Sequence, residues 1–239
     1  ALADALKVNG VLTELDLSYN NIKDTGAEAL ASALRVNGVL KKLNLWFNSI
    51  GPTGATALAD ALKVNGVLTK LNLDGHELDL PKLRGTNPVE SLDLSRKGLR
   101  PASAIVIASL IAGNGVLTKL NLDGHELDLP KLRGTDPVTS LDLAAKGLGP
   151  ASAIVIASLI AGNGVLTKLN LDGHELDLPK LRGTDPVASL DLSQIGLGPA
   201  SAIVITSLIA GNAVLTSLDV GLNRLTEEAA LGIGAAQTQ

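Results

Sequence analysis

The chain has no cysteine and almost no aromatic side chains. Its 239 residues include one Trp, one Tyr and one Phe. Without cysteine there is no disulfide, no thiolate nucleophile and no cysteine-ligated metal. With so few rings the core has to be aliphatic, and a hydrophobic content of 46% allows a large one.

An excess of one charge and long apolar runs are also missing. The 24 acidic and 20 basic residues give a net charge of −4 and form no like-charge block, so neither nucleic acid nor a membrane surface is an expected partner. The apolar stretch Ala104–Ala112 is too short for a bilayer, which needs about 20 residues. No signal peptide and no Asn-x-Ser/Thr sequon is visible, which favours a cytoplasmic location.

What the chain does have is a repeat. The motif Leu-x-Leu returns nine times, at steps of 28, 28, 21, 28, 21, 28, 21 and 28 residues. Such a period predicts a solenoid, in which each coil buries its apolar face against its neighbours. The first leucines of the motif are Leu15, Leu43, Leu71, Leu92, Leu120, Leu141, Leu169, Leu190 and Leu218.

We predict one domain over residues 1–239. The 49-residue blocks that begin at Leu71 and Leu120 differ at only five positions, which fits recent duplication or deliberate concatenation. The chain also begins inside a repeat, as a natural fragment or an engineered repeat protein would. The predicted segments are 28-residue repeats (1–70), three 49-residue double repeats (71–217), and a C-terminal strand with a capping helix (218–239).

Each 28-residue unit predicts one strand and one helix. Leu43 and Leu45 alternate with Asn44, so the leucines face inward and the asparagine outward. Leu58 and Leu62 follow, four residues apart on one helical face. The 21-residue segments contain LDGHELDLPKLRGTDPV or a close copy of it, which is interrupted by Pro and Gly and predicts irregular structure. Neighbouring strands lie about 4.8 Å apart and packed helices about 8–10 Å apart, so one helix per strand makes a solenoid curve. One helix per two strands nearly removes this difference. Residues 71–217 should therefore form a flatter segment than residues 1–70.

The pattern LxxLxLxxNxI followed by GAxALAxALxxN is close at residues 11–70 and recurs in every 28-residue unit. It resembles the leucine-rich repeat family, in particular its ribonuclease-inhibitor-like class, here alternating with 21-residue repeats. The resemblance implies an α/β solenoid shaped as a right-handed horseshoe arc. Its concave face would be a parallel sheet of about nine strands, and its convex face would carry helices that alternate with short irregular segments.

The resemblance also implies a function. Members of the family usually grip other proteins on the concave strand face, so we expect a non-enzymatic protein-interaction scaffold. One branch of the class activates GTPases, which gives a GTPase-activating regulator as the alternative. A structural, self-assembling module is a further alternative.

One family position departs from the pattern. The Asn of LxLxxN, which bonds the adjoining turn in the family, is replaced in six units. A neutral imidazole offers the same kind of hydrogen-bonding group, whereas lysines have to extend outward. Asparagine is kept at Asn20, Asn48 and Asn223, and the replacements are His76, His125, His174, Lys97, Lys146 and Ile195.

The predicted binding face consists of the outward positions of the strands and the loops that follow them. Exposed aromatics on a rigid scaffold anchor protein interfaces, although these three rings are equally able to pack over one another. Outward Asn and Asp alternate along the strands and form either a structural ladder or a recognition stripe. The predicted partner-binding residues are Tyr19, Trp46, Phe47, Lys42, Asn44, Lys70, Asn72, Asp74, Asp93 and Arg96.

The helical side offers a second surface. Ile105, Ile154 and Ile203 recur at one helical position and predict either an apolar stripe for a homo-oligomer or contacts with the short segments.

No catalytic, cofactor or metal site is expected. The three histidines do not form HExxH, and copies two strands apart, about 10 Å, are too distant for one zinc ion. The carboxylates near His76 lack the oxygen density of a calcium loop.

Overall fold

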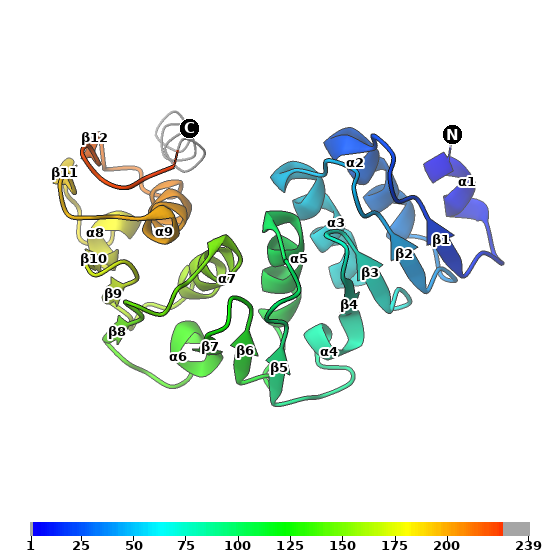
Figure 1. The fold of residues 1–239 in the computed structure, drawn as a ribbon, viewed down its shortest axis with the longest axis horizontal. Helices are drawn as coiled ribbons and strands as arrows, with labels where there is room; N and C mark the ends of the chain where they lie inside the picture. Colours follow the sequence, from blue (N-terminus) through cyan, green and yellow to red (C-terminus); the bar gives the residue numbers. More distant parts are fainter. Residues whose placement is uncertain (1, 227–239) are drawn as a thin grey trace. The chain divides into compact units, whose positions relative to one another are not determined.

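The structure is a computed structural model that describes residues 2–226. It contains two compact units, Ala1–Leu122 and Asp123–Gln239, each an alternation of short strands and helices (Figure 1). The capping helix predicted near the C-terminus lies beyond Leu225-Thr226, outside the described residues. No helix within residues 2–226 combines the length and apolar character that crossing a bilayer requires.

The first unit contains four long or medium helices and one short helix among six strands. Its elements are α1 (Leu2–Val8), β1 (Glu14–Asp16), α2 (Lys23–Leu34), β2 (Lys42–Asn44), α3 (Pro52–Val64), β3 (Lys70–Asn72), β4 (Glu77–Asp79), α4 (Leu80–Arg84), β5 (Ser91–Asp93), α5 (Pro101–Ile111) and β6 (Lys119–Asn121).

The described part of the second unit begins with a strand and a short helix. Its elements are β7 (Glu126–Asp128), α6 (Leu129–Arg133), β8 (Ser140–Asp142), α7 (Pro150–Ile160), β9 (Lys168–Asn170), β10 (Glu175–Asp177), α8 (Leu178–Arg182), β11 (Ser189–Asp191), α9 (Pro199–Ile209) and β12 (Ser217–Asp219).

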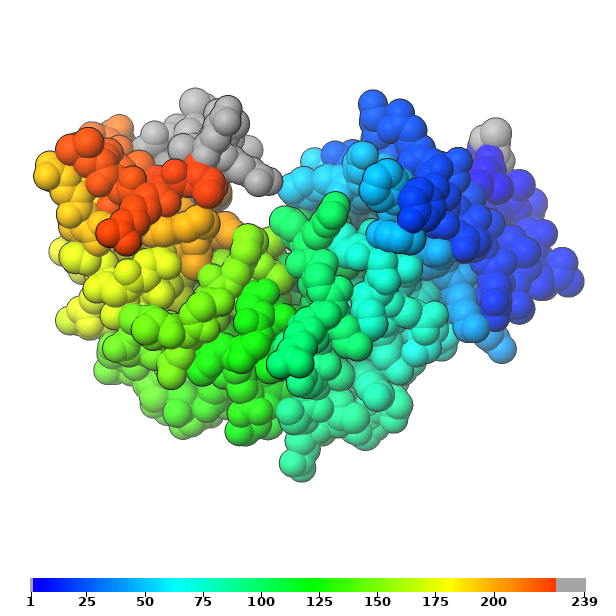
Figure 2. Space-filling view, viewed as in Figure 1, coloured from blue at the N-terminus to red at the C-terminus, as the bar shows by residue number. Residues whose placement is uncertain are grey.

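All nine Leu-x-Leu segments form strands, and their leucines line an aliphatic core. β1, β2 and β3 pair in parallel with Leu15, Leu43 and Leu71 in register. Among the described residues every buried hydrophobic side chain is Leu, Ile, Val or Ala, which confirms the predicted aliphatic core. The coils of residues 2–122, blue to green in Figure 2, pack directly on one another on the face shown. The fold is an α/β solenoid.

The prediction of one parallel nine-stranded sheet is wrong. β3 is followed in its sheet by β4, which runs antiparallel to it and places Leu71 opposite Leu78. The chain reverses because the Asn72 side chain accepts a hydrogen bond from the Gly75 amide at 2.8 Å, and Gly75 adopts φ +87°, a conformation open to glycine. β9 and β10 form the same hairpin in the second unit.

The 21-residue segments are therefore ordered, which corrects the prediction of irregular structure. After the hairpin, Asp79 caps the five-residue helix α4 by accepting from the Lys82 amide at 3.3 Å. Gly85, at φ +81°, ends it. Each 49-residue block thus adds three strands and two helices, so the two-to-one ratio behind the predicted flattening does not hold. The flattening itself stays a prediction.

Neighbouring coils are joined by asparagines that follow the long helices. Asn65 donates from Nδ2 to the carbonyl oxygens of Leu34 and Asn37 of the preceding coil, at 2.6 and 3.1 Å. Its Oδ1 accepts from the amides of Val67 and Leu68. A buried amide side chain thereby satisfies carbonyls that a helix end leaves open. Equivalent residues are Asn37, Asn114, Asn163 and Asn212.

Candidate functional site

The outward face of the sheet β1–β4 carries a shallow hollow of about 280 Å³. Strand alternation places polar side chains on this face while the leucines between them point to the core. Four of the predicted binding residues border the hollow, and three acidic residues that were not predicted do so as well. The polar lining is Glu14, Asp16, Lys42, Asn44, Lys70, Asn72 and Glu77.

The two lysines of this face are paired with acids. Lys42 Nζ lies 3.0 Å from a carboxylate oxygen of Glu14. Lys70 Nζ lies 3.3 Å from Glu77 and 3.4 Å from Asp79, both supplied by the returning strand β4. Partial burial by itself lowers the pKa of Lys70, but its hydrogen bond to Glu77 and the charge of Asp79 raise it overall. The lysines are therefore neutralised from within the sheet.

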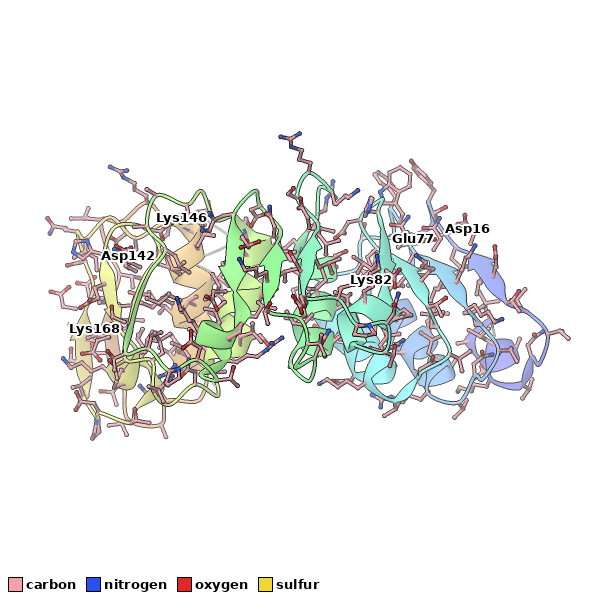
Figure 3. All side chains as sticks on the ribbon, turned by 90° about the horizontal axis from the view of Figure 1, so that it is seen from below. Asp16, Glu77, Lys82, Asp142, Lys146 and Lys168 are labelled. Atoms are coloured by element: carbon pink, nitrogen blue, oxygen red, sulfur yellow. The ribbon has the colours of Figure 1, made fainter. Side chains whose placement is uncertain are left out.

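Asp16 is the carboxylate of the hollow that no cation among residues 2–226 neutralises. Its Oδ1 accepts from the Ser18 amide and hydroxyl at 2.8 and 2.6 Å, and its Oδ2 accepts from Asn44 Nδ2 at 3.0 Å. The Ser18 bonds, followed by the Asn44 bond, hold the pKa of Asp16 below its usual range. Figure 3 shows Asp16 and Glu77 over neighbouring parts of the same sheet.

The three aromatic rings pack on one another beside this hollow. Tyr19 meets Trp46 edge-on, with ring centroids 4.7 Å apart, and stacks on Phe47 at 5.0 Å. Trp46 is half-buried and lies against the β3–β4 turn, where a Cβ added to Gly75 would come within 3.0 Å of its Nε1. The Trp46 ring is therefore partly covered by this turn. Tyr19 and Phe47 remain 61% and 62% exposed.

Backbone geometry fixes the exposed rings in place. Tyr19 and Phe47 have φ of +56° and +57°, a region that costs a residue with a Cβ about 1–2 kcal/mol. Gly75 and Arg96 occupy the same repeat position and also have positive φ. The turn thus demands this conformation in every coil of the first unit, and two coils present a ring there.

The sequence comparisons agree with this architecture. A model of the leucine-rich repeat family matches residues 8–31, 36–59 and 211–234. The matched segments include strands and helices of the first two coils and the strand of the last described coil.

The chain contains leucine-rich repeats.

Two solved structures are similar to it in part. Leiomodin-1 Actin-Binding Site 2 is 26% identical over 50% of this chain and 58% of that chain, with a TM-score of 0.34. The tropomodulin C-terminal domain from Caenorhabditis elegans is 14% identical over 99% of this chain and 89% of that one, with a TM-score of 0.29. No curated protein matches.

Three of the predicted binding residues lie away from the hollow of this repeat protein. Asp74 Oδ2 accepts from the backbone amides of Arg100 and Ser103, at 2.8 and 3.3 Å, and so caps helix α5. Asp93 belongs to β5, in a different sheet, and accepts from the Ser95 amide at 2.8 Å. Arg96 is exposed on the loop that follows. Asp74 therefore has a structural task that the sequence analysis missed.

The histidines at the asparagine position do not take over its bonds. Asn48 donates to the carbonyls of Leu17 and Leu45 at 2.7 and 3.0 Å, as the family pattern implies. By contrast, no side-chain hydrogen bond joins His76, His125 or His174 to another of residues 2–226. At His76 the hairpin makes a side-chain bond from this position unnecessary, because the Asn72 side chain closes the turn by accepting from the Gly75 amide. Burial, then the charge of Lys97, lowers the pKa of His76.

The predicted stripe on the helical side is half-buried at Ile105, Ile154 and Ile203. Its proposed role in self-association stays a prediction.

The sequence analysis missed Glu14, Asp16 and Glu77. Glu14 and Asp16 flank Leu15 in the first strand and were visible from strand alternation. Glu77 reaches the face only because β4 folds back. The signal was the Asp74-Gly75 pair followed by alternating polar and apolar residues, which is typical of a hairpin.

Proposed function

We propose that this protein is a non-enzymatic scaffold that binds another protein through the outward face of sheet β1–β4. Leucine-rich repeats generally serve protein interaction, and the family matches support that general role here. The observation that places the binding site on this face is the exposed pair Tyr19 and Phe47. Both residues lie in turns with positive φ next to the hollow. Rigid aromatics beside paired charges are the usual composition of interface anchors.

The proposed binding residues are those that border the hollow together with the three rings. Lys42, Asn44, Lys70 and Asn72 stay in the set, and Glu14, Asp16 and Glu77 join it. Asp74 is left out because it caps α5. Asp93 and Arg96 are left out because they belong to β5 and its loop, which is in another sheet.

Selection from a random peptide library displayed on phage, with the immobilised chain as bait, tests the proposal. Phe47→Gly removes a ring and keeps a residue suited to φ +57°. Selected peptides should bind this variant at least about tenfold more weakly. Gln194→Gly is the matched control, because Gln194 sits at the same repeat position with φ +57° and no ring.

Retained peptide affinity in Gln194→Gly is expected. Failure to enrich any peptide, or selected peptides that bind Phe47→Gly as tightly as the unaltered chain, would overturn the proposal. Circular dichroism of both variants shows that the fold is intact.

A further inference from the structure

The face of sheet β1–β4 carries more negative than positive charge. Four carboxylates project from it, those of Glu14, Asp16, Glu77 and Asp79, against the ammonium groups of Lys42 and Lys70. Lys42 contacts Glu14, and Lys70 contacts both acids of β4. The remaining carboxylate, that of Asp16, is exposed and has no cationic neighbour among the described residues. A partner placed on this face therefore meets an acid that it can neutralise.

Asp16 is connected to the aromatic cluster of Tyr19, Trp46 and Phe47 by a short chain of hydrogen bonds. Asn44 donates from Nδ2 to Asp16, and its Oδ1 accepts from the Trp46 amide at 3.1 Å. The Tyr19 amide in turn donates to the Trp46 carbonyl at 2.9 Å. The carboxylate and the rings therefore occupy neighbouring positions on the same two coils, and this local framework is hydrogen-bonded throughout.

The bonds that Asp16 already makes define what can still approach it. A carboxylate offers about four lone-pair directions. Ser18 uses both of those on Oδ1, and Asn44 uses one on Oδ2. One direction on Oδ2 stays open, on an exposed residue beside exposed rings. A group that donates one N–H there and covers a ring with a flat cationic surface fits this arrangement.

We propose that the partner protein inserts an arginine side chain here, with one guanidinium N–H on Asp16 Oδ2 and the guanidinium plane against the exposed Tyr19 ring. Arginine combines a planar cation that stacks on aromatic faces with donors suited to carboxylates. Lysine offers a compact, strongly hydrated charge without a plane to stack. This inference rests on the proposed function, because it names the chemistry that the same face recognises.

The chain contains a matched control for the carboxylate. Asp191 Oδ1 accepts from the Ser193 amide and hydroxyl at 2.9 and 2.7 Å, which repeats the Asp16 loop. The residue at the position of Tyr19 is Gln194, and the opposite strand residue is Asp219. Asp191→Asn therefore alters the same local bonds where no ring is present.

Peptides whose binding depends on Phe47 provide the probe. Each of their arginines is replaced by citrulline, a neutral analogue of the same shape, and separately by lysine. Binding is followed by the fluorescence of Trp46, the only tryptophan of the chain. One citrulline replacement should weaken binding about tenfold, and so should Asp16→Asn, while Asp191→Asn leaves it unchanged. The two changes combined should weaken binding no further than either alone, because they remove the same contact.

The possible outcomes separate the inference from the proposed function. Phe47-dependent peptides without an essential arginine would overturn the arginine assignment and leave the binding face standing. The same holds if Asp16→Asn binds normally or if lysine replaces arginine without loss. If no selected peptide depends on Phe47, the proposed function itself fails. Added salt should weaken the arginine-dependent binding, because both charges are at the surface.

Discussion

The guanidinium of Arg84 donates from Nη2 to the backbone carbonyl oxygen of Asn65 at 2.7 Å. The same nitrogen lies 3.2 Å from the carbonyl of Leu62, and Nη1 donates to Leu68 at 2.8 Å. These carbonyls end helix α3 and the turn after it, where the 28-residue coils use an asparagine. An arginine from the short coil thus replaces the asparagine link, and its charge also suits the negative end of the α3 dipole.

Arg84→Lys should lower the free energy of unfolding by about 2 kcal/mol, because an ammonium group cannot reach three carbonyls arranged for a planar fork. Burial lowers the pKa of Arg84, but a guanidinium stays protonated near neutral pH. Urea denaturation measures the change. Arg96→Ala is the control, since Arg96 is exposed and Ala145 stands at its position in the next block. An unfolding midpoint for Arg84→Lys equal to that of the unaltered chain would contradict this account.

Asp74→Ala should destabilise the first unit by about 1–2 kcal/mol, because the amino end of α5 loses a charged cap. Asp74→Asn should cost less, since an amide oxygen still accepts a hydrogen bond. Asp136→Asn is the control: Asp136 is exposed, and Asn87 stands at that position one block earlier. Thermal unfolding followed by circular dichroism measures all three variants. Lost peptide binding with unchanged stability would instead assign Asp74 to the interface.

The sequence predicted the strands and long helices because burial follows directly from the spacing of leucines. The repeat pattern also places asparagine at positions 48 and 65, where the side chains of Asn48 and Asn65 form hydrogen bonds to backbone carbonyls. The hairpin at Asp74-Gly75 was not predicted although its turn signal is present, because Pro81 and Gly85, which interrupt regular structure, follow within a few residues.

Other features of the site could not be read from spacing. The role of Asp74 depends on which helix end lies beside it, and that end belongs to Arg100, 26 residues later. The placement of Trp46 depends on the hairpin, because its ring lies where Gly75 leaves room. Both follow from contacts between coils, and a single coil's sequence carries no sign of them.

Ser193→Ala should raise the pKa of Asp191 toward its usual value of 3.8. The Ser193 hydroxyl, followed by the Ser193 amide, lowers that pKa, so the folded state holds this carboxylate charged more strongly than the unfolded chain does. The corresponding stabilisation is present above the unfolded pKa and is lost as pH falls through the folded pKa. The variant should therefore lose stability at neutral pH and differ little in strong acid.

Carboxyl carbon NMR across a pH titration measures the pKa, and Ser189→Ala is the control. An unchanged Asp191 pKa in Ser193→Ala would show that the hydroxyl does not set it.

Ser152→Ala should stabilise the second unit by about 1 kcal/mol, because a buried hydroxyl without a partner is costly and alanine favours helices. The Ser152 side chain is fully buried in α7, and its Oγ has no hydrogen-bond partner among the described residues. The same repeat position is Gly54 in α3, where an added Cβ would lie 2.7 Å from Asp24 Oδ1 and 2.9 Å from the Ala27 Cβ. The long helices α2 and α3 are in contact there, whereas α7 follows the short helix α6 and carries a serine at this position. Gly54→Ala should therefore destabilise the first unit while Ser152→Ala stabilises the second, and urea denaturation of each variant measures both signs. A loss of stability in Ser152→Ala would mean that the hydroxyl is bonded to the carbonyl of the preceding helical turn.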